Sequence, residues 1–380
     1  MKLKSLYINN YRCLQNFTID FEQSDALLLL GRNGMGKTTV LGVLSIIHSI
    51  SCGIDQVGDL FTRRDFAFGQ FDAPMRFEIS MEIDGVIYKY SFAVVPSSDA
   101  NEVSILEEGL KAGDAVFFSR SSDGGLFLSK DNALCDCPIG SGRFFLALSS
   151  GSNRCGVACE KVRAFISSWL LVSPWPSSIR KGFARNESFL ALDASNFLSW
   201  FRSIIVRNVG FTDQLMKYLG NGFFKERVSF GWTDPTKERE NDMLFSFSDD
   251  SSGRVWEGRF SEMSDGEKIF VIGAALMTCN AIRGGTFCFW DEPDNFLAIS
   301  EVQGFITRLR KSFGHDRGQL VITSHNIETI RTIGIDATAI IQRASQLEPA
   351  RIQFVRDNLR TAEERDNYIQ DVLSGDIYGL

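Results

Sequence analysis

The sequence predicts an α/β fold whose core is a largely parallel sheet with both faces covered. Two unbroken apolar runs, "ALLLL" at residues 26–30 and "TFCFW" at 286–290, have the composition of strands buried on both sides. A helical pattern follows each run, and "QLVITS" at 319–324 predicts a further buried strand. Buried strands that alternate with helices are typical of parallel sheets.

Three segments of different composition indicate how the chain is organised. Residues 1–95 contain alternating strands and a "DG" hairpin signal, which predicts an N-terminal lobe with an antiparallel β subdomain. Residues 96–240 are rich in Ser, Gly and Asp and carry helical patterns at 159–172 and 189–206, so we expect a mixed, partly helical insertion. Residues 241–380 return to strands and helices and predict a C-terminal lobe.

The overall composition excludes several classes of protein. The 380 residues are 44% hydrophobic, which is enough for a sizeable core. The net charge of -7 means that nucleic-acid binding would need a local basic patch. The apolar runs are too short to cross a bilayer, and the first ten residues lack the apolar segment of a signal peptide. We therefore expect a cytoplasmic protein with no membrane partner.

Eight cysteines raise the question of a metal site. The closest groups, "CDCP" and "CGVAC", do not have the paired C-x2-C spacing of a zinc ribbon. Reduced, buried thiols are the favoured interpretation, with a structural zinc as the alternative.

One basic stretch, "RKGFAR" at 180–185, offers Arg180, Lys181 and Arg185 around Phe183. It fits a DNA contact and fits a solvated loop equally well, so both interpretations stay open.

The segment from Gly31 to Thr39, "GRNGMGKTT", fits the phosphate-loop pattern G-x-x-x-x-G-K-[ST]. It lies between a predicted buried strand and a predicted helix, which is the context that such a loop requires. In this pattern the lysine reaches the β- and γ-phosphates and the following hydroxyl binds Mg²⁺. The candidate nucleotide-binding residues are Asn33, Gly34, Gly36, Lys37, Thr38 and Thr39, with Thr38 also a candidate Mg²⁺ ligand.

Two adjacent acids, Asp291 and Glu292, follow the apolar strand at 286–290. Carboxylates at this place are costly unless they meet positive charge. We predict that Asp291 holds Mg²⁺ and that Glu292 orients or deprotonates an attacking water. The alternative is an ordinary pair of acids at a strand end, with Pro293 starting a helix.

His325 follows the strand at 319–324 and is one of three histidines. A neutral imidazole there could bind the γ-phosphate or the attacking water. A lone histidine after a strand is usually structural. The functional hypothesis depends on its being one helix and one strand beyond Glu292, at the end of the adjacent strand.

The stretch "SDGEK" at 264–268 stands at the start of an apolar helix. Ser264 and Glu267 have the spacing of a capping box, in which each side chain binds a backbone N–H of the other residue. Helix capping alone explains these polar residues, so a functional role must come from the other motifs.

Together, "GRNGMGKTT", "SDGEK", "FCFWDEP" and "TSHN" resemble the motifs of ABC-type ATPase heads of the SMC, RecF and OLD families. The resemblance covers roughly residues 1–95 and 240–345, and "NNYRC" resembles the element that precedes the phosphate loop in those heads. It implies that Arg12 lies beside the nucleotide and makes Gln70 the candidate Q-loop residue, for nucleotide and metal. The family's S-G-G-Q/E motif departs here to Ser264-Asp265-Gly266-Glu267.

The resemblance implies a P-loop ATPase of ABC type that uses ATP and Mg²⁺ with slow turnover. It also implies a head-to-head homodimer in which Ser264, Gly266 and Glu267 of one subunit face the ATP of the other. Glu292 and His325 are then the catalytic residues.

The biological role stays open among three hypotheses. The first is a gating or sensing ATPase of an anti-phage system, similar to the Septu ATPase, with a separately encoded nuclease or toxin. The second is a RecF-like ATPase of DNA repair or recombination. The third is an ATP-bound scaffold of low turnover that restrains a toxin.

Overall fold

The computed structural model divides into two compact units. Unit 1 comprises residues 1–169 and 336–380, and unit 2 comprises residues 170–335. The segment 96–240, expected as one insertion, is thus shared between the units. The structure describes residues 1–22, 24–97, 102–121, 126–128, 134–135, 140–150, 154–180, 182, 187–220, 223–224, 226–233, 242–249, 251–314, 317–358 and 364.

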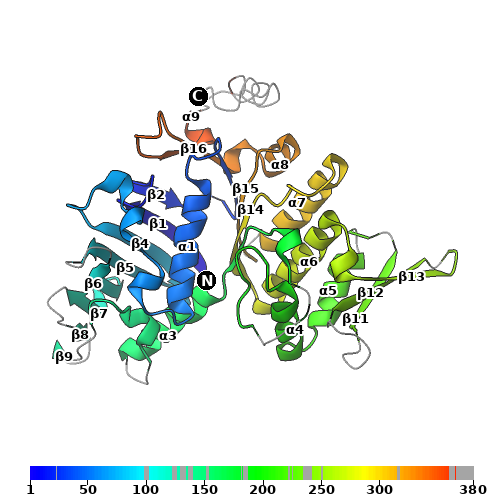
Figure 1. Cartoon of the computed structure of the whole chain (residues 1–380), viewed down its shortest axis with the longest axis horizontal. Helices are drawn as coiled ribbons and strands as arrows, with labels where there is room; N and C mark the ends of the chain where they lie inside the picture. Colours follow the sequence, from blue (N-terminus) through cyan, green and yellow to red (C-terminus); the bar gives the residue numbers. More distant parts are fainter. Residues whose placement is uncertain are drawn as a thin grey trace. The chain divides into compact units, whose positions relative to one another are not determined.

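Unit 1 contains a large antiparallel sheet with the strand order β2-β1-β4-β5-β6-β7-β8-β9 (Figure 1). The predicted hairpin is confirmed: Asp84 and Gly85 join β4 to β5 with positive φ angles of 52° and 75°, as a type I′ turn requires. The bounds of the strands are β1 Lys2–Asn9, β2 Phe17–Asp20, β4 Met75–Ile83, β5 Val86–Pro96, β6 Val103–Ala112, β7 Ala115–Ser121, β8 Leu126–Leu128 and β9 Leu134–Cys135.

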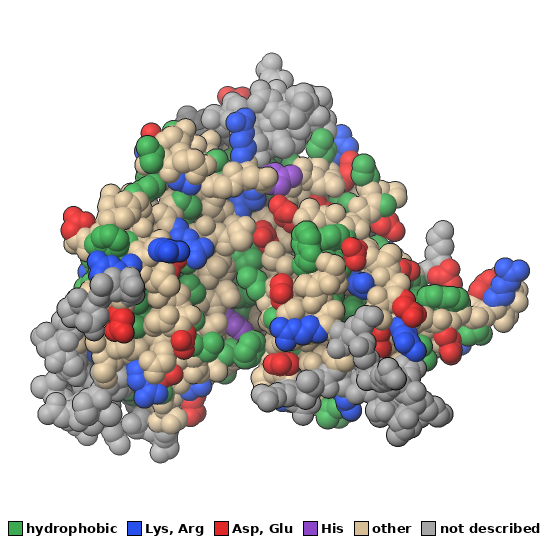
Figure 2. Space-filling model, viewed as in Figure 1, with side chains coloured by type: hydrophobic (Ala, Val, Ile, Leu, Met, Phe, Trp, Pro, Cys, Tyr) green, Lys and Arg blue, Asp and Glu red, His purple; other side chains and the backbone are tan. Residues whose placement is uncertain are grey.

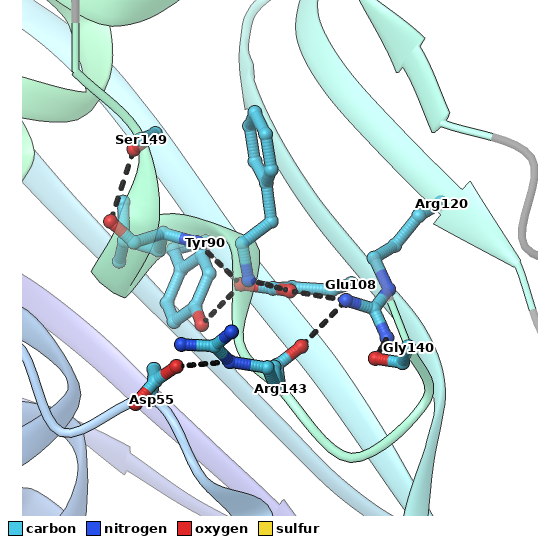
Figure 3. A network of polar contacts seen from close by, with 9 residues as sticks. Asp55, Tyr90, Glu108, Arg120, Gly140, Arg143 and Ser149 are labelled. Carbon is cyan, nitrogen blue, oxygen red and sulfur yellow. Dashed lines mark hydrogen bonds and ion pairs between the residues drawn. The ribbon is translucent and has the colours of Figure 1, made fainter. Parts of the chain in front are cut away.

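A buried polar cluster ties this sheet to the short helix α2 (Phe145–Leu148) (Figure 3). The Glu108 carboxylate accepts hydrogen bonds from the backbone N–H groups of Phe145 and Leu146 and from the Tyr90 hydroxyl. Arg120 pairs with Glu108 at 3.7 Å. Burial raises the pKa of the Glu108 carboxyl, although the backbone N–H groups and Arg120 act in the opposite direction. A buried carboxylate with these partners serves to position α2.

A second group of strands in unit 1 carries the glycine-rich loop. Strand β3 (Ala26–Leu30) pairs in parallel with β16 (Thr338–Gln342), which pairs antiparallel with β17 (Arg351–Phe354). All five residues of β3 are buried, as its unbroken apolar sequence predicts. The remaining helices of unit 1 are α1 Lys37–Ser51, α3 Arg154–Ser167 and α9 Val355–Asn358, with 3₁₀ turns at Val57–Asp59, Arg63–Asp65 and Ala67–Gly69.

Unit 2 is built on three parallel strands in the order β10-β14-β15. Helices α6 and α7 cross tightly beside them, since a Cβ on Gly273 of α6 would lie 2.7 Å from the Phe305 ring of α7. The strands are β10 Leu170–Val172, β14 Thr286–Asp291 and β15 Gly318–Thr323, and the helices are α4 Phe197–Arg207, α5 Phe211–Gly220, α6 Asp265–Arg283, α7 Ile299–Phe313 and α8 Ile327–Ile333.

A separate antiparallel sheet of three strands completes unit 2. Its order is β11-β12-β13, with β11 Arg227–Trp232, β12 Met243–Asp249 and β13 Arg254–Arg259. Strand β11 contacts α5, and α5 in turn contacts α6. In Figure 1 the hairpin of β12 and β13 extends away from the helices of this unit.

Two helical patterns of the sequence end differently from the prediction. Leu170–Val172, at the end of the first pattern, form β10 because they pair with Cys288–Trp290 of β14. In the second pattern the helix begins only at Phe197, because the Asn196 side chain binds Ala191 N–H and Phe189 O and holds the preceding residues in a turn. Tertiary pairing and a side-chain turn have overridden the helical period.

No helix in the described part of the chain is long and apolar enough to cross a membrane.

Candidate nucleotide site

The glycine-rich loop of unit 1 connects β3 to α1, as predicted. Gly36 adopts the left-handed φ of 117°, and a Cβ there would approach Cys13 Sγ to 3.1 Å. Gly31 is required for a different reason, since its Cβ would lie 2.4 Å from the carbonyl oxygen of Ile341 in β16. The glycines therefore let the loop turn tightly against neighbouring backbone at the N-terminus of a 15-residue helix.

Lys37 is the first residue of α1, and its side chain turns back over the loop. Only 6% of Lys37 is exposed, and its Nζ donates hydrogen bonds to the carbonyl oxygens of Gly31 and, at 3.5 Å, Arg32. Thr38 is exposed in the same first turn, while Thr39 is half-buried with its Oγ1 3.9 Å from Cys13 Sγ. Asn33 and Gly34 are exposed at the tip of the loop. An ammonium and a helix N-terminus thus converge on one loop, which suits a phosphate.

A second loop, residues 343–350, supports the first and was missed by the sequence analysis. The Arg343 guanidinium donates to Gly34 O at 3.2 Å, to Gln346 O at 2.5 Å and to Glu348 O at 2.9 Å. The backbone N–H of Ala350 donates to Cys13 O at 2.8 Å. No local pattern could have revealed this, because the contact joins residues more than three hundred positions apart.

Arg12 lies in unit 1 in a backbone conformation that is unusual for its type. Its φ is 51°, and it is held by two bonds to Asp65: N–H to the backbone oxygen at 2.7 Å and Nε to Oδ1 at 2.9 Å. The guanidinium also lies 5.2 Å from the centre of the Tyr11 ring. Tyr11 is itself buried, and this burial raises the pKa of its hydroxyl to about 12. The side chain remains 53% exposed. Asp65, which the sequence did not single out, therefore sets the direction of Arg12.

Gln70, the candidate Q-loop residue, lies at the end of the 3₁₀ turn Ala67–Gly69 in unit 1. Its Oε1 accepts a hydrogen bond from Gln15 Nε2 at 2.8 Å, and its backbone oxygen accepts one from Asn10 Nδ2 at 3.0 Å. The side chain is exposed. Its predicted role toward nucleotide and metal stays a prediction.

In unit 2 the two predicted acids stand at the carboxyl end of β14, opposite Thr323 of β15. Thr323 Oγ1 donates to Asp291 Oδ1 at 2.5 Å and accepts from Glu292 N at 3.0 Å. Ser173, after β10, donates to the other oxygen of Asp291 at 3.3 Å. The hydroxyls of Thr323 in β15 and of Ser173 just after β10 thus orient the Asp291 carboxylate, and Thr323 links it to the backbone of Glu292.

Glu292 and His325 lie side by side, as the sequence predicts for residues that follow adjacent parallel strands. His325 Nε2 is 3.7 Å from Glu292 Oε1, and Asn295 Nδ2 donates to Glu292 Oε2 at 2.5 Å. Glu292 has a φ of 52°, which is strained for a residue with a side chain and is typical of functional positions. Pro293 does not start a helix, because α7 begins only at Ile299. A water beside this pair could hydrogen-bond to both the carboxylate and the imidazole.

Asp294 joins the loops that follow β14 and β15. It is only 6% exposed, and its Oδ2 accepts hydrogen bonds from Ser324 Oγ and Thr329 Oγ1, both at 2.5 Å. Ser324 and Thr329 are fully buried. Because Asp294 follows Glu292 by two positions and Ser324 precedes His325, this cluster fixes the two candidate catalytic side chains relative to each other.

The predicted capping box at Ser264 is confirmed. Ser264 Oγ accepts from Glu267 N at 3.3 Å, while Glu267 Oε2 accepts from the N–H and the hydroxyl of Ser264 at 2.8 and 2.7 Å. Ser264 itself is exposed, at the positive end of the 19-residue helix α6. A Cβ on Gly266 would lie 3.0 Å from Phe296 O, so this turn packs closely against the loop that follows Glu292.

The chemistry of the donors fits ATP with Mg²⁺. A threonine hydroxyl at Thr38 and a carboxylate at Asp291 are oxygen ligands of the kind that Mg²⁺ prefers. Within the described residues, no three His, Cys, Asp or Glu side chains are grouped to hold a metal. Mg²⁺ commonly takes part of its ligand set from substrate phosphates.

The other sequence hypotheses are only partly covered by the described residues. Arg180 is exposed, but Lys181, Phe183 and Arg185 lie outside the described residues. Cys137 also lies outside them, and only the backbone of Cys135 is described. The six other cysteines, at 13, 52, 155, 159, 279 and 288, are free thiols.

Comparisons with known proteins agree with the fold. Residues 1–102 match the model of the AAA ATPase domain family AAA_15. The SMC head bound to the C-winged helix domain of ScpA has a TM-score of 0.54 at 12% identity, and the match covers 95% of this chain and 100% of that chain. The SMC head of Pyrococcus furiosus with an extended coiled coil gives 0.53 at 10% identity, over 96% and 99%. The chain therefore has the fold of an ABC-type, SMC-like ATPase head.

A curated relative is more similar in sequence over a short region. It is "ABC transporter I family member 20" of Arabidopsis thaliana, 34% identical over 88 residues, or 18% of this chain and 27% of the relative. The chain thus spans about a quarter of that relative's length. This similarity and the AAA ATPase match each cover only part of the chain, and the match to the ATPase family lies in residues 1–102.

Proposed function

We propose that this protein binds ATP with Mg²⁺ at the loop of unit 1 and hydrolyses it with Glu292 as base. The observation that carries the proposal is the Glu292–His325 pair, 3.7 Å apart at the ends of adjacent parallel strands and fixed by Thr323 and Asn295. Such a pair has a specific use in a chain that also contains a phosphate loop. A carboxylate can take the proton of an attacking water while the imidazole donates to the phosphate.

The roles of the other residues follow from their chemistry. Lys37 supplies a positive charge to the β- and γ-phosphates, and the backbone N–H groups of the loop supply further donors. Thr38 and Asp291 are each candidate ligands of Mg²⁺, an ion that neutralises phosphate charge when bound. Arg12, directed by Asp65, offers a further cation to the nucleotide.

We further propose that two copies close head to head around ATP. The support is the exposed position of Ser264 at the N-terminus of α6, where its helix end can meet a phosphate of another subunit. ATP would then favour a closed dimer, and hydrolysis would release it.

The change Ser264→Arg tests this arrangement. The long cation would block approach of a second subunit at the exposed helix end, so ATP-dependent dimerisation should be lost while ATP binding to the monomer is retained. Analytical ultracentrifugation with and without ATP measures the first property, and nucleotide titration measures the second. Ser261→Arg, a half-buried serine just before the motif, is the matched control. A Ser264→Arg protein that still dimerises in ATP would contradict the proposed interface.

The biological role that we favour is gating of a partner protein, a separately encoded nuclease or toxin, in an anti-phage system. The general support is that an ATP-driven dimer is a two-state element which a bound partner can read. A RecF-like role in DNA repair and an ATP-bound scaffold of low turnover remain the alternative proposals. Salt-dependent DNA binding that disappears in the triple change of Arg180, Lys181 and Arg185 to Ala would favour repair. Purification of a tagged chain from its native cell with its bound partner would favour gating.

Asp294 should affect turnover more than nucleotide binding. In Asp294→Ala the hydroxyls of Ser324 and Thr329 lose their acceptor, and the loops of Glu292 and His325 are no longer fixed together. A displacement of about 1 Å costs about a hundred-fold in rate, so kcat should fall by ~10- to 100-fold with KM for ATP nearly unchanged. Asp294→Asn, which keeps one acceptor oxygen, should recover part of the rate. If Asp294→Ala and Asp294→Asn lost the same amount of kcat as each other, and also the same amount of thermal stability, the role of Asp294 would be purely structural.

A further inference from the structure

A groove on unit 2 lies beside the β12–β13 hairpin and reaches the start of α6. Its volume is about 530 Å³. Phe224, Phe247 and Trp256 give it apolar walls, and Glu267 of the capping box lines one end. Figure 2 shows hydrophobic, acidic and basic side chains beside one another along this hairpin. The groove therefore combines apolar surface and charge next to Ser264.

Trp256 is held in place although it is largely exposed. Its indole lies over Gly258, where a Cβ would be only 2.1 Å from the ring, and its ring centre is 5.4 Å from that of Phe247. Trp256 is nevertheless 56% exposed, and its neighbour Val255 is 64% exposed. An exposed tryptophan that is already held in one conformation can contribute strongly to the binding free energy of a protein interface, because little side-chain entropy is lost on binding.

One edge of β13 has no ladder partner among the described residues. In the sheet order β11-β12-β13 it is a terminal strand, and within the described residues its ladder partner is β12 alone. The first four residues of β13 are exposed. A terminal strand with exposed apolar side chains is a template for strand addition, in which main-chain hydrogen bonds give affinity and side-chain pockets give specificity.

The charge of the groove selects its occupant. Among the residues that the structure describes, three carboxylates, of Glu226, Asp249 and Glu267, line the groove together with the single guanidinium of Arg254. Hydrogen bonds from Ser251 and Ser252 hold the pKa of Asp249 at about 2, so this carboxylate is ionised at neutral pH. The groove thus favours a cationic partner.

We infer that this groove docks an extended segment of a partner protein in which an apolar side chain is flanked by lysine or arginine. The apolar side chain would pack on Trp256 while the cations face Glu226 and Asp249. Pairing of this groove with the same groove of a second copy is disfavoured, because the three carboxylates of one copy would face the three carboxylates of the other.

Docking here would also reach the motif at Ser264. Glu267 lines the groove and simultaneously accepts two hydrogen bonds from Ser264, at 2.8 and 2.7 Å. A cation of the bound segment near Glu267 would compete with those bonds. This regulatory step rests on the proposed function, whereas docking itself does not.

The probe for docking is a fluorescent peptide of alternating lysine and valine, with an alternating glutamate and valine peptide as its counterpart. Fluorescence anisotropy should show binding of the lysine peptide alone, at physiological salt and without nucleotide. Trp256→Ala should weaken binding about 30-fold, as loss of a central aromatic residue does. Glu226→Lys, an exposed change that leaves the apolar walls intact, should weaken it about tenfold. A lysine–valine peptide methylated at alternate backbone nitrogens should not bind if a strand is added to β13.

The control is Trp175→Ala, which removes another tryptophan of unit 2 that is 59% exposed and outside the groove. It should bind the peptide as the unchanged protein does. Equal binding of both peptides, or unchanged binding in Trp256→Ala and Glu226→Lys, would overturn the inference. Loss of the ATP-dependent dimer in Trp256→Ala would also overturn it, since the occupant would then be a second copy. If the unchanged protein binds the lysine peptide but has no ATPase activity, the proposed function is refuted and the docking site still stands.

Discussion

Lys37→Met is expected to abolish ATP binding at the concentrations where the unchanged protein binds it. The methionine keeps the apolar stem of a residue that is only 6% exposed, but it removes the ammonium that donates to the loop carbonyls of Gly31 and Arg32. Loss of one partner from a buried, hydrogen-bonded charge pair costs about 2–5 kcal/mol. That is a factor of roughly 30 to several thousand in Kd. Isothermal titration with ATP and Mg²⁺ measures the change directly.

The matched control for this prediction is Lys4→Met. Lys4 lies in β1 of the same unit and pairs with Glu22 and Glu82 at 2.6 and 2.9 Å, away from the glycine-rich loop. An exposed pair of this kind contributes about 0–1 kcal/mol to stability, so Lys4→Met should bind ATP normally. If Lys37→Met kept an unchanged Kd with a normal unfolding curve, the loop would not be a phosphate site.

Much of the fold was predictable because its signals are local. The five residues of β3 are unbroken apolar sequence and are all buried. Asp84 and Gly85 fix a hairpin through their own backbone preferences. The closeness of Glu292 to His325 also followed, because carboxyl ends of neighbouring parallel strands meet at one edge.

The remaining contacts depend on positions that sequence spacing cannot reveal. Leu170–Val172 have a helical pattern, yet pairing with β14 makes them a strand. Arg343 supports the glycine-rich loop from the far end of the chain. Thr323 and Asp294 are ordinary polar residues in the sequence, and only the register of β14 with β15 places them at the candidate catalytic pair. Supporting residues of this kind carry no motif, because any hydroxyl or carboxylate in the right place would serve.

Glu292→Gln is expected to separate ATP binding from ATP hydrolysis. The amide keeps the shape of the side chain and can still accept a hydrogen bond from Asn295, but it cannot take a proton from water. Loss of a general base lowers the rate by about a hundred- to ten-thousand-fold, while Kd for ATP should change little. Because hydrolysis is the step that opens the proposed dimer, the variant should accumulate as a dimer in ATP. Phosphate release and sedimentation measure the two effects.

Glu301→Gln is the matched control. Glu301 is an exposed acid in the first turn of α7, and its carboxylate accepts a hydrogen bond from the backbone N–H of Ala298. It should hydrolyse ATP and dissociate at the normal rate. If Glu292→Gln hydrolysed ATP normally, Glu292 would not be the general base. His325 would be the next candidate, because its Nε2 lies 3.7 Å from Glu292 Oε1. A Glu292→Gln protein that binds ATP, fails to hydrolyse it and stays monomeric would keep the ATPase and reject the dimer. Phosphate release therefore tests the role of the Glu292 carboxylate in hydrolysis, and sedimentation of the same variant tests whether unhydrolysed ATP holds two copies together.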